Sequence, residues 1–229
     1  MMQYIKDNLA AVTAELTAAG GTSRMLAAVK YAAPGEIEAL LDAGVTDVGE
    51  NRVQQLLENA PIYEARDVRV HFIGSLQTNK VKYIADKVDM IHSLDSEKLA
   101  REIEKRAAAC GRVIDVLVEI NVAREEAKTG VMPEDAEALC RTVLSLSHLR
   151  LCGFMTMGPI FDSEQAYRDY FKKTVALGNT LWNTLSLAGR PLYSMGMSQS
   201  FAAAVKEGAD FVRVGRRLFA GRPDTNTDQ

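Results

Sequence analysis

Two short glycine turns near the end of the chain carry the residue types best suited to binding an anion. The first is Ser194-Met-Gly-Met-Ser198, which ends an apolar run, and the second is Val214-Gly215-Arg216. Glycine lets backbone N–H groups approach an anion closely, and a helix start adds free N–H donors and a positive dipole end. Ser198 alone is more simply explained as the cap of the helix that follows it. Two such turns together favour a phosphate site built from Ser198, Gly215 and Arg216.

A lysine at the end of another apolar run is the second candidate. Lys30 follows Met25-Leu-Ala-Ala-Val29, and Pro34 opens a predicted helix shortly after it. A single lysine in such a place commonly extends past its apolar neighbours to solvent. A desolvated lysine amine is instead neutral and attacks carbonyl groups. A phosphate site with an imine-forming lysine suits pyridoxal 5′-phosphate (PLP), an aldehyde with a phosphate tail, or a sugar phosphate in a Schiff-base aldolase.

An arginine inside a predicted strand helps to choose between these ligands. Phe211 and Arg213 alternate with two valines, so the two side chains share one face of the strand. A charged side chain on an apolar strand needs a partner. Arg213 would keep a pyridine nitrogen unprotonated by donating a hydrogen bond to it. An internal ion pair with Glu50 or Glu119 is the other explanation, and the residues alone leave both open.

Eight short apolar runs, each followed by a helical pattern or a short turn, must position these groups. Short strands that alternate with amphipathic helices indicate a parallel sheet with right-handed crossovers, and eight units predict a closed (β/α)₈ barrel of the TIM type. We expect one domain over residues 1–229, an extra N-terminal helix that covers the barrel bottom, and a loose tail at 224–229. An open doubly wound sheet is the alternative. The predicted strands are 25–30, 46–49, 68–73, 88–92, 113–121, 148–155, 192–195 and 210–214.

The carboxyl ends of the predicted strands concentrate polar residues. In a parallel barrel these ends meet at one face, where active sites lie. Besides Lys30 and the glycine turns, this face is expected to hold Asn51, His71 and the segment around Met155. One mouth would therefore bring the lysine, the arginine and the two turns together.

Composition narrows the class of protein. The 229 residues are 47% hydrophobic and 25% charged, with a net charge of −3, so nothing attracts the chain to nucleic acid or an anionic membrane. The first helix is amphipathic and differs from a signal peptide. The three cysteines and three histidines lack metal-ligand spacing, so no metal is expected. Scattered cysteines suit a cytoplasmic protein.

Seven motifs keep one order along the chain: Leu26-Ala-Ala-Val-Lys30, Gly49-Glu-Asn-Arg-Val-Gln-Gln55, His71-Phe-Ile-Gly-Ser-Leu-Gln-Thr-Asn-Lys80, Glu126-Ala-Lys-Thr-Gly130, Gly153-Phe-Met-Thr-Met157, Ser194-Met-Gly-Met-Ser198 and Val212-Arg-Val-Gly215. Together they resemble the pyridoxal phosphate homeostasis protein family, also called YggS-like, which is related to the N-terminal domain of alanine racemase. The resemblance runs nearly end to end. Each motif alone is weak, and the ordered set is specific.

The resemblance implies a site as well as a fold. PLP would be held as an aldimine on Lys30, and its phosphate by Ser198, Gly215 and the backbone of Arg216. Arg213 would face the pyridine nitrogen. The remaining residues that the resemblance places around the ring are Asn51, His71 and Met155.

The implied function is to hold and deliver the cofactor within the cell. Arginine at the ring nitrogen weakens PLP as an electron sink. Racemisation also needs an acid and a base on opposite faces of the substrate carbon, and we expect no second domain after Gly221 to supply the second group. We therefore expect a non-catalytic monomer that supplies apo forms of PLP-dependent enzymes. The alternatives are a racemase-like enzyme of low activity and, less favoured, a Schiff-base aldolase on phosphosugars.

Three positions depart from the family pattern. Val29 stands where serine or threonine usually precedes the lysine, Ser200 where aspartate is usual, and Arg216 where a hydroxyl residue is usual. The change at Arg216 removes a hydroxyl from the expected phosphate site and supplies a cation, which is a stronger partner for an anion.

Overall fold

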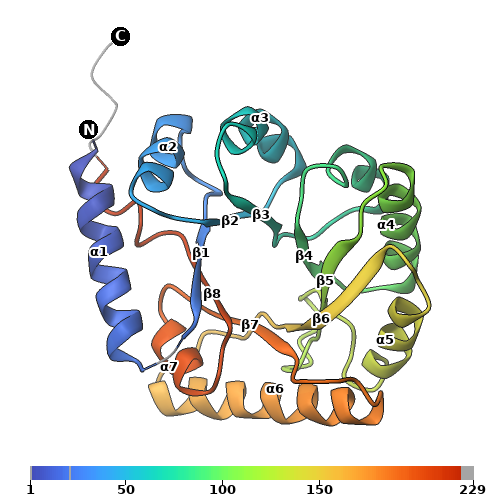
Figure 1. Ribbon diagram of the computed structural model, residues 1–229. Helices are drawn as coiled ribbons and strands as arrows, with labels where there is room; N and C mark the ends of the chain where they lie inside the picture. Colours follow the sequence, from blue (N-terminus) through green and yellow to red (C-terminus); the bar gives the residue numbers. More distant parts are fainter. Residues whose placement is uncertain (1, 21, 223–229) are drawn as a thin grey trace.

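Eight parallel strands close into a barrel in the computed structural model, which describes residues 2–20 and 22–222 (Figure 1). β1 pairs with β2 on one side and with β8 on the other, which closes the sheet. The predicted barrel is confirmed, and the expected tail at 224–229 lies outside the described residues. The strands are β1 Arg24–Ala28, β2 Asp47–Glu50, β3 Arg69–Phe72, β4 Met90–Leu94, β5 Ile114–Glu119, β6 Leu149–Met155, β7 Leu192–Met197 and β8 Phe211–Val214.

Helices surround the barrel because each buries one apolar stripe against the strands. In α4, Leu99, Ile103 and Ala107 recur every four residues and are buried, whereas the opposite face is charged. The segment after β3 forms only a short 3₁₀ helix, and residues 217–220 after β8 form a turn. The helices are α1 Gln3–Ala18, α2 Pro34–Asp42, α3 Val53–Glu64, η1 Thr78–Tyr83, α4 Glu97–Ala109, α5 Ala136–Leu144, α6 Glu164–Thr184 and α7 Phe201–Lys206. Within the described ranges, none of these helices has the length and apolarity that a membrane crossing requires.

The N-terminal helix α1 occupies a place in the ring of helices, between α2 and α7 (Figure 1). The expectation that it covers the barrel bottom is wrong. β8 is followed by a turn, so the eighth position of the ring is open, and α1 fills it with Ile5, Val12 and Leu16. The Asn8 side chain donates hydrogen bonds to the carbonyls of Leu218 and Ala220 in that turn, at 3.2 and 2.8 Å.

A buried carboxylate lies at the amino-terminal end of the barrel. Asp47 begins β2, and its oxygens contact Arg69 at 2.8 Å, Thr46 at 2.9 Å and the Nε2 atom of His71 at 3.1 Å. Burial alone would raise the pKa of Asp47, but the hydrogen bonds from His71, Arg69 and Thr46 outweigh it and lower the pKa well below its usual range. Asp47 is therefore ionised at neutral pH and satisfied by its neighbours.

The docking of α1 can be measured. Ile5 is fully buried, so Ile5→Ala leaves a cavity and is expected to lower the free energy of unfolding by about 2–5 kcal/mol in urea titrations. Thr13→Ala, on the exposed face of the same helix, is the control and is expected to change it by less than about 0.5 kcal/mol. Equal effects of the two variants would contradict this packing.

The Asp47 carboxylate makes stability depend on pH in one direction. Its pKa is lower in the folded than in the unfolded chain, so it stabilises the fold above the unfolded pKa, and this contribution disappears as the pH falls below about 4. Asp47→Asn is expected to cost about 3 kcal/mol at pH 7, with the difference from the unaltered protein shrinking toward pH 3. Urea titrations across this range test this expectation, and Asp67→Asn, at an exposed position, is the control. A difference that stays constant with pH would refute the assignment.

Candidate cofactor site

A cavity of about 240 Å³ opens at the carboxyl ends of β1, β2, β6, β7 and β8. Its wall contains six of the eight residues that the sequence singles out, from four different strand ends. These six are Lys30, Asn51, Ser198, Arg213, Gly215 and Arg216. The barrel thus brings together the lysine, the arginine and both glycine turns, although Lys30 and Arg216 lie 186 positions apart in the sequence.

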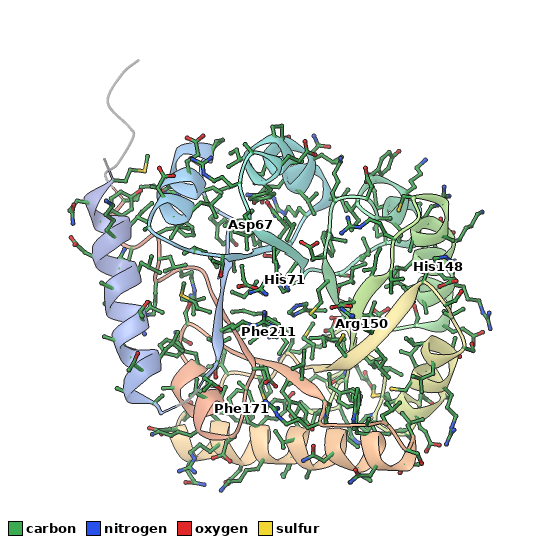
Figure 2. All side chains as sticks on the ribbon, viewed as in Figure 1. Asp67, His71, His148, Arg150, Phe171 and Phe211 are labelled. Carbon is green, nitrogen blue, oxygen red and sulfur yellow. The ribbon has the colours of Figure 1, made fainter. Side chains whose placement is uncertain are left out.

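The other two residues, His71 and Met155, do not line the cavity. Their exposed fractions are 2% and 1%, and both lie inside the barrel. Met155 packs with Leu117 and Phe211 in an apolar cluster. Figure 2 shows His71 and Phe211 at the centre of the ring of strands. His71 and Met155 are therefore separated from the mouth by the residues above them on the strands.

The two glycine turns contact each other directly. The Gly215 N–H donates to the Oγ atom of Ser198 at 3.4 Å. The helix after β7 begins at Phe201, so Ser198 precedes its cap position, and the simpler explanation of this serine as a helix cap is wrong. Among the described residues, the backbone N–H groups of Ser198, Gln199 and Arg216 have no hydrogen-bond partner in the protein. A hydroxyl and several free N–H donors thus surround one point, which suits an anion with several oxygens.

Glycine is required in these turns for two different reasons. Gly196 has a φ of +86°, which favours glycine, and a Cβ there would lie 2.5 Å from the Cβ of Ala204. A Cβ on Gly215 would lie 2.9 Å from the carbonyl oxygen of Ala28 on the neighbouring strand. The turns are therefore held close to the backbone of both neighbouring elements.

Ser200 has a local role that explains how serine replaces the usual aspartate. Its Oγ atom accepts a hydrogen bond from the Met197 N–H at 3.1 Å, and its own N–H donates to the Met197 carbonyl at 2.8 Å. Ser200 is also the cap residue of α7 and is buried. An oxygen at this position closes the turn, and a hydroxyl oxygen is sufficient for that bond.

Lys30 is half-buried, and its Nζ atom lies 5.0 Å from the ring centre of Tyr31. Tyr31 itself is 62% exposed. The Lys30 ammonium lowers the pKa of Tyr31 below its usual value, and the charges of Arg52 and Arg216 lower it further. The mouth of the cavity therefore carries positive potential, which attracts an anionic ligand.

Arg213 forms no ion pair with a carboxylate among the described residues. Its guanidinium donates to the Oγ atom of Ser194 at 2.7 Å and to the carbonyl of Thr156 at 2.9 Å. Burial lowers the pKa of Arg213 to about 10, while the charge of Glu119 opposes this shift. Arg213 therefore remains charged at neutral pH, and its Nε–H has no partner in the described part of the protein.

The two carboxylates considered as partners of Arg213 are bound elsewhere. Glu50 accepts hydrogen bonds from Asn59 at 2.8 Å and Tyr63 at 2.6 Å, both on α3. Glu119 accepts one from Thr129 at 2.6 Å. The proposed ion pair with Glu50 or Glu119 is therefore wrong, and Arg213 instead contributes to the wall of the cavity.

An apolar wall completes the cavity, and the aromatic part of this wall was not predicted. It comes from the segment after β6, residues 157–160, and from Tyr167 and Phe171 on α6. Figure 2 labels Phe171 on the inner side of this helix. The i, i+4 spacing of the two aromatic residues is also that of a helix packed on a core, so the pattern alone does not reveal a ligand wall.

Comparisons with known proteins agree with this geometry. Residues 2–223 match the family model of the N-terminal domain of alanine racemase. A protein of Aquifex aeolicus named pyridoxal phosphate homeostasis protein is 42% identical over 200 residues, which cover 87% of each chain. A protein of the same name from Schizosaccharomyces pombe is 37% identical over 90% of this chain and 87% of its own. The chain belongs to the pyridoxal phosphate homeostasis protein family.

Solved structures place this family member among related barrels. The structure of PipY from Synechococcus elongatus, determined with PLP bound, is 27% identical with a TM-score of 0.84 and covers 94% of this chain and 99% of that one. Alanine racemase from Clostridium difficile is 16% identical with a TM-score of 0.73, and the match covers 59% of its length. The second similarity shows a shared barrel fold.

The hydrogen bond from Met197 to Ser200 can be tested by substitution. Ser200→Ala leaves the Met197 N–H without its acceptor, so the free energy of unfolding is expected to fall by about 1 kcal/mol. Ser200→Asp restores an acceptor oxygen and is expected to remain within about 0.5 kcal/mol of the unaltered protein. Urea titrations of the two variants provide the measurement, and an alanine variant as stable as the parent would contradict the role given to Ser200.

Proposed function

We propose that this protein binds PLP in the cavity at the barrel mouth, covalently through Lys30, and serves as a cytoplasmic store that buffers and delivers the cofactor. The observation that carries the proposal is the presence of three complementary groups in one cavity. These are a lysine amine, a free guanidinium N–H and a cluster of unpaired backbone N–H donors. Each matches one polar part of PLP: the aldehyde, the ring nitrogen and the phosphate.

The cavity residues divide among these parts. Ser198, Gly215 and the backbone of Arg216 would hold the phosphate, with the Arg216 side chain adding a positive charge. Arg213 would donate to the ring nitrogen, and Asn51 would contact the ring from the end of β2. His71 and Met155 are buried inside the barrel and do not line the cavity, so they are not proposed as ligand contacts. When bound, PLP supplies an aldehyde that condenses with an amine, and the protein supplies its position.

The family relationship supports this assignment. PipY was solved with PLP bound, and the curated relatives carry the name pyridoxal phosphate homeostasis protein. The chain covers most of their length, so the comparison concerns the whole barrel. We further propose that the protein acts as a monomer and that apo forms of PLP-dependent enzymes receive the cofactor from it.

Binding without turnover follows from the arginine. A guanidinium with a pKa of about 10 holds its proton at neutral pH, so it would donate a hydrogen bond to the pyridine nitrogen without transferring the proton. An unprotonated ring accepts electrons poorly and gives little stabilisation to a carbanion. This favours a carrier over a racemase of low activity. A Schiff-base aldolase would have no use for a hydrogen-bond donor placed at a ring nitrogen.

Borohydride trapping tests the covalent site. After incubation with PLP and reduction, peptide mass analysis is expected to find the added cofactor mass on Lys30. Lys30→Ala should lose this label, because the amine is gone, whereas Lys98→Ala on the exposed face of α4 should keep it. Failure of the unaltered protein to bind or retain PLP would overturn the proposed function.

Two further outcomes separate the alternative functions. Conversion of L-alanine or L-serine to its mirror form by the pure protein, lost in Lys30→Ala, would replace the carrier function with racemisation. Trapping of a sugar phosphate on Lys30 in place of PLP would favour an aldolase. We expect neither of these outcomes.

The phosphate contact can be tested at Ser198. Ser198→Ala is expected to bind PLP about tenfold more weakly than the parent, because a hydroxyl donor to the phosphate is lost.

A further inference from the structure

A continuous chain of polar side chains runs through the barrel interior, from its amino-terminal end to the cavity. The Nε2 atom of His71 lies 3.1 Å from the Asp47 carboxylate, and its Nδ1 atom lies 2.9 Å from Nε2 of His92. Nδ1 of His92 lies 2.9 Å from Oγ of Ser194, which accepts from Arg213 at 2.7 Å. Four hydrogen bonds thus connect five residues that come from β2, β3, β4, β7 and β8.

Apolar side chains enclose this chain. The ring of Phe211 lies 5.3 Å from the rings of both His71 and His92, centre to centre. His92 and Ser194 are fully buried. Hydrogen bonds in such a low-dielectric interior are stronger than in water, and an unpaired polar group there is costly. Each of these five side chains is therefore held in place by the hydrogen bonds to its neighbours.

The two ends fix the outer hydrogen bonds, and neutral rings would fix the two inner ones. A guanidinium only donates and an ionised carboxylate only accepts, so Arg213 donates to Ser194 and His71 donates from Nε2 to Asp47. A neutral His71 would then accept at Nδ1 from Nε2 of His92, and a neutral His92 would accept at Nδ1 from the hydroxyl of Ser194. In this arrangement both histidines carry their proton on Nε2, and every hydrogen bond runs from Arg213 toward Asp47.

The electrostatics of the interior favour a neutral His92. Burial lowers the pKa of His92 well below its usual value. A second proton on His71 would lie on Nδ1 and reverse its hydrogen bond with His92, so the single direction exists only with two neutral rings.

We propose that Asp47, His71, His92 and Ser194 form a positioning relay for Arg213, which fixes the guanidinium so that its free N–H faces the nitrogen of the cofactor ring. The inference rests on the proposed function and deepens it, since it names the residues that set the contact at that nitrogen. The relay acts through Arg213, and none of its other members reaches the cavity. The carbonyl of Thr156 holds the second arm of the same guanidinium at 2.9 Å.

The tautomers can be measured in the protein without cofactor. The chain contains three histidines, so long-range proton–nitrogen correlation spectra of ¹⁵N-histidine-labelled protein are simple, and His148→Gln identifies the third ring. The relay requires that His71 and His92 are neutral with the proton on Nε2. A proton on Nδ1 of either ring, or on both nitrogens, would overturn the relay whatever the protein binds.

A matched pair of variants tests the effect on the cofactor. Ser194→Ala removes the acceptor of Arg213 and the hydroxyl that contacts His92, whereas Ser93→Ala removes an equally buried serine hydroxyl that has no hydrogen-bond partner in the described part of the protein. We expect Ser194→Ala to bind PLP about tenfold more weakly and to shift the absorption maximum of the bound cofactor. We expect Ser93→Ala to match the parent in both, and thermal unfolding confirms that the two variants are folded.

The outcomes distinguish the relay from the proposed function. If the parent does not retain PLP on Lys30, the function fails. If the parent retains PLP but Ser194→Ala changes neither its affinity nor its absorption, the relay fails and the function stands. A loss of stability in Ser194→Ala without any effect on the bound cofactor would show that the hydrogen bonds from Asp47 to Arg213 only support the fold.

Discussion

The buried charge of Arg213 is the constraint on which much of the barrel interior depends. A guanidinium inside a barrel must be hydrogen-bonded, and among the described residues no carboxylate lies within ion-pair distance of it. The interior therefore places a serine on β7 and histidines on β3 and β4, where apolar residues would otherwise pack. These groups connect the cation to the carboxylate of Asp47 at the other end of the barrel. The same arrangement leaves one side of Arg213 free for a ligand.

Most of the fold could be predicted from the sequence because its signals are local. Each strand is a short apolar run, and most are followed by a helical repeat, so eight units and a closed barrel follow from the order of the patterns. The rule that active groups lie at carboxyl strand ends then places Lys30, Ser198 and Arg213 in one cavity, as the structure does. The position of α1 could not be predicted in this way. It depends on the open place in the ring of helices beside β8, where the chain forms a turn after the strand.

The depth of a side chain in the barrel could not be read from the sequence. His71 pairs in register with Gly49, two residues before Asn51, so it lies lower in the barrel than the asparagine that reaches the mouth. The contact of His71 with His92 joins residues 21 positions apart on different strands, and no rule based on sequence spacing predicts it. Ser200 is similar, since its role depends on a turn geometry that aspartate and serine both satisfy.

The charge of Arg213 bears on whether the proposed PLP site would favour storage or catalysis. With a pKa of about 10, the guanidinium keeps its proton at pH 7. In the proposed relay Ser194 accepts from Arg213 and donates to His92, so no group on the protein side of Arg213 would be oriented to take that proton. A proton transfer to the ring nitrogen would also leave a neutral arginine among groups that are oriented for a cation. Such a site favours a cofactor whose ring stays unprotonated, which is a form suited to storage and poorly suited to stabilising a carbanion.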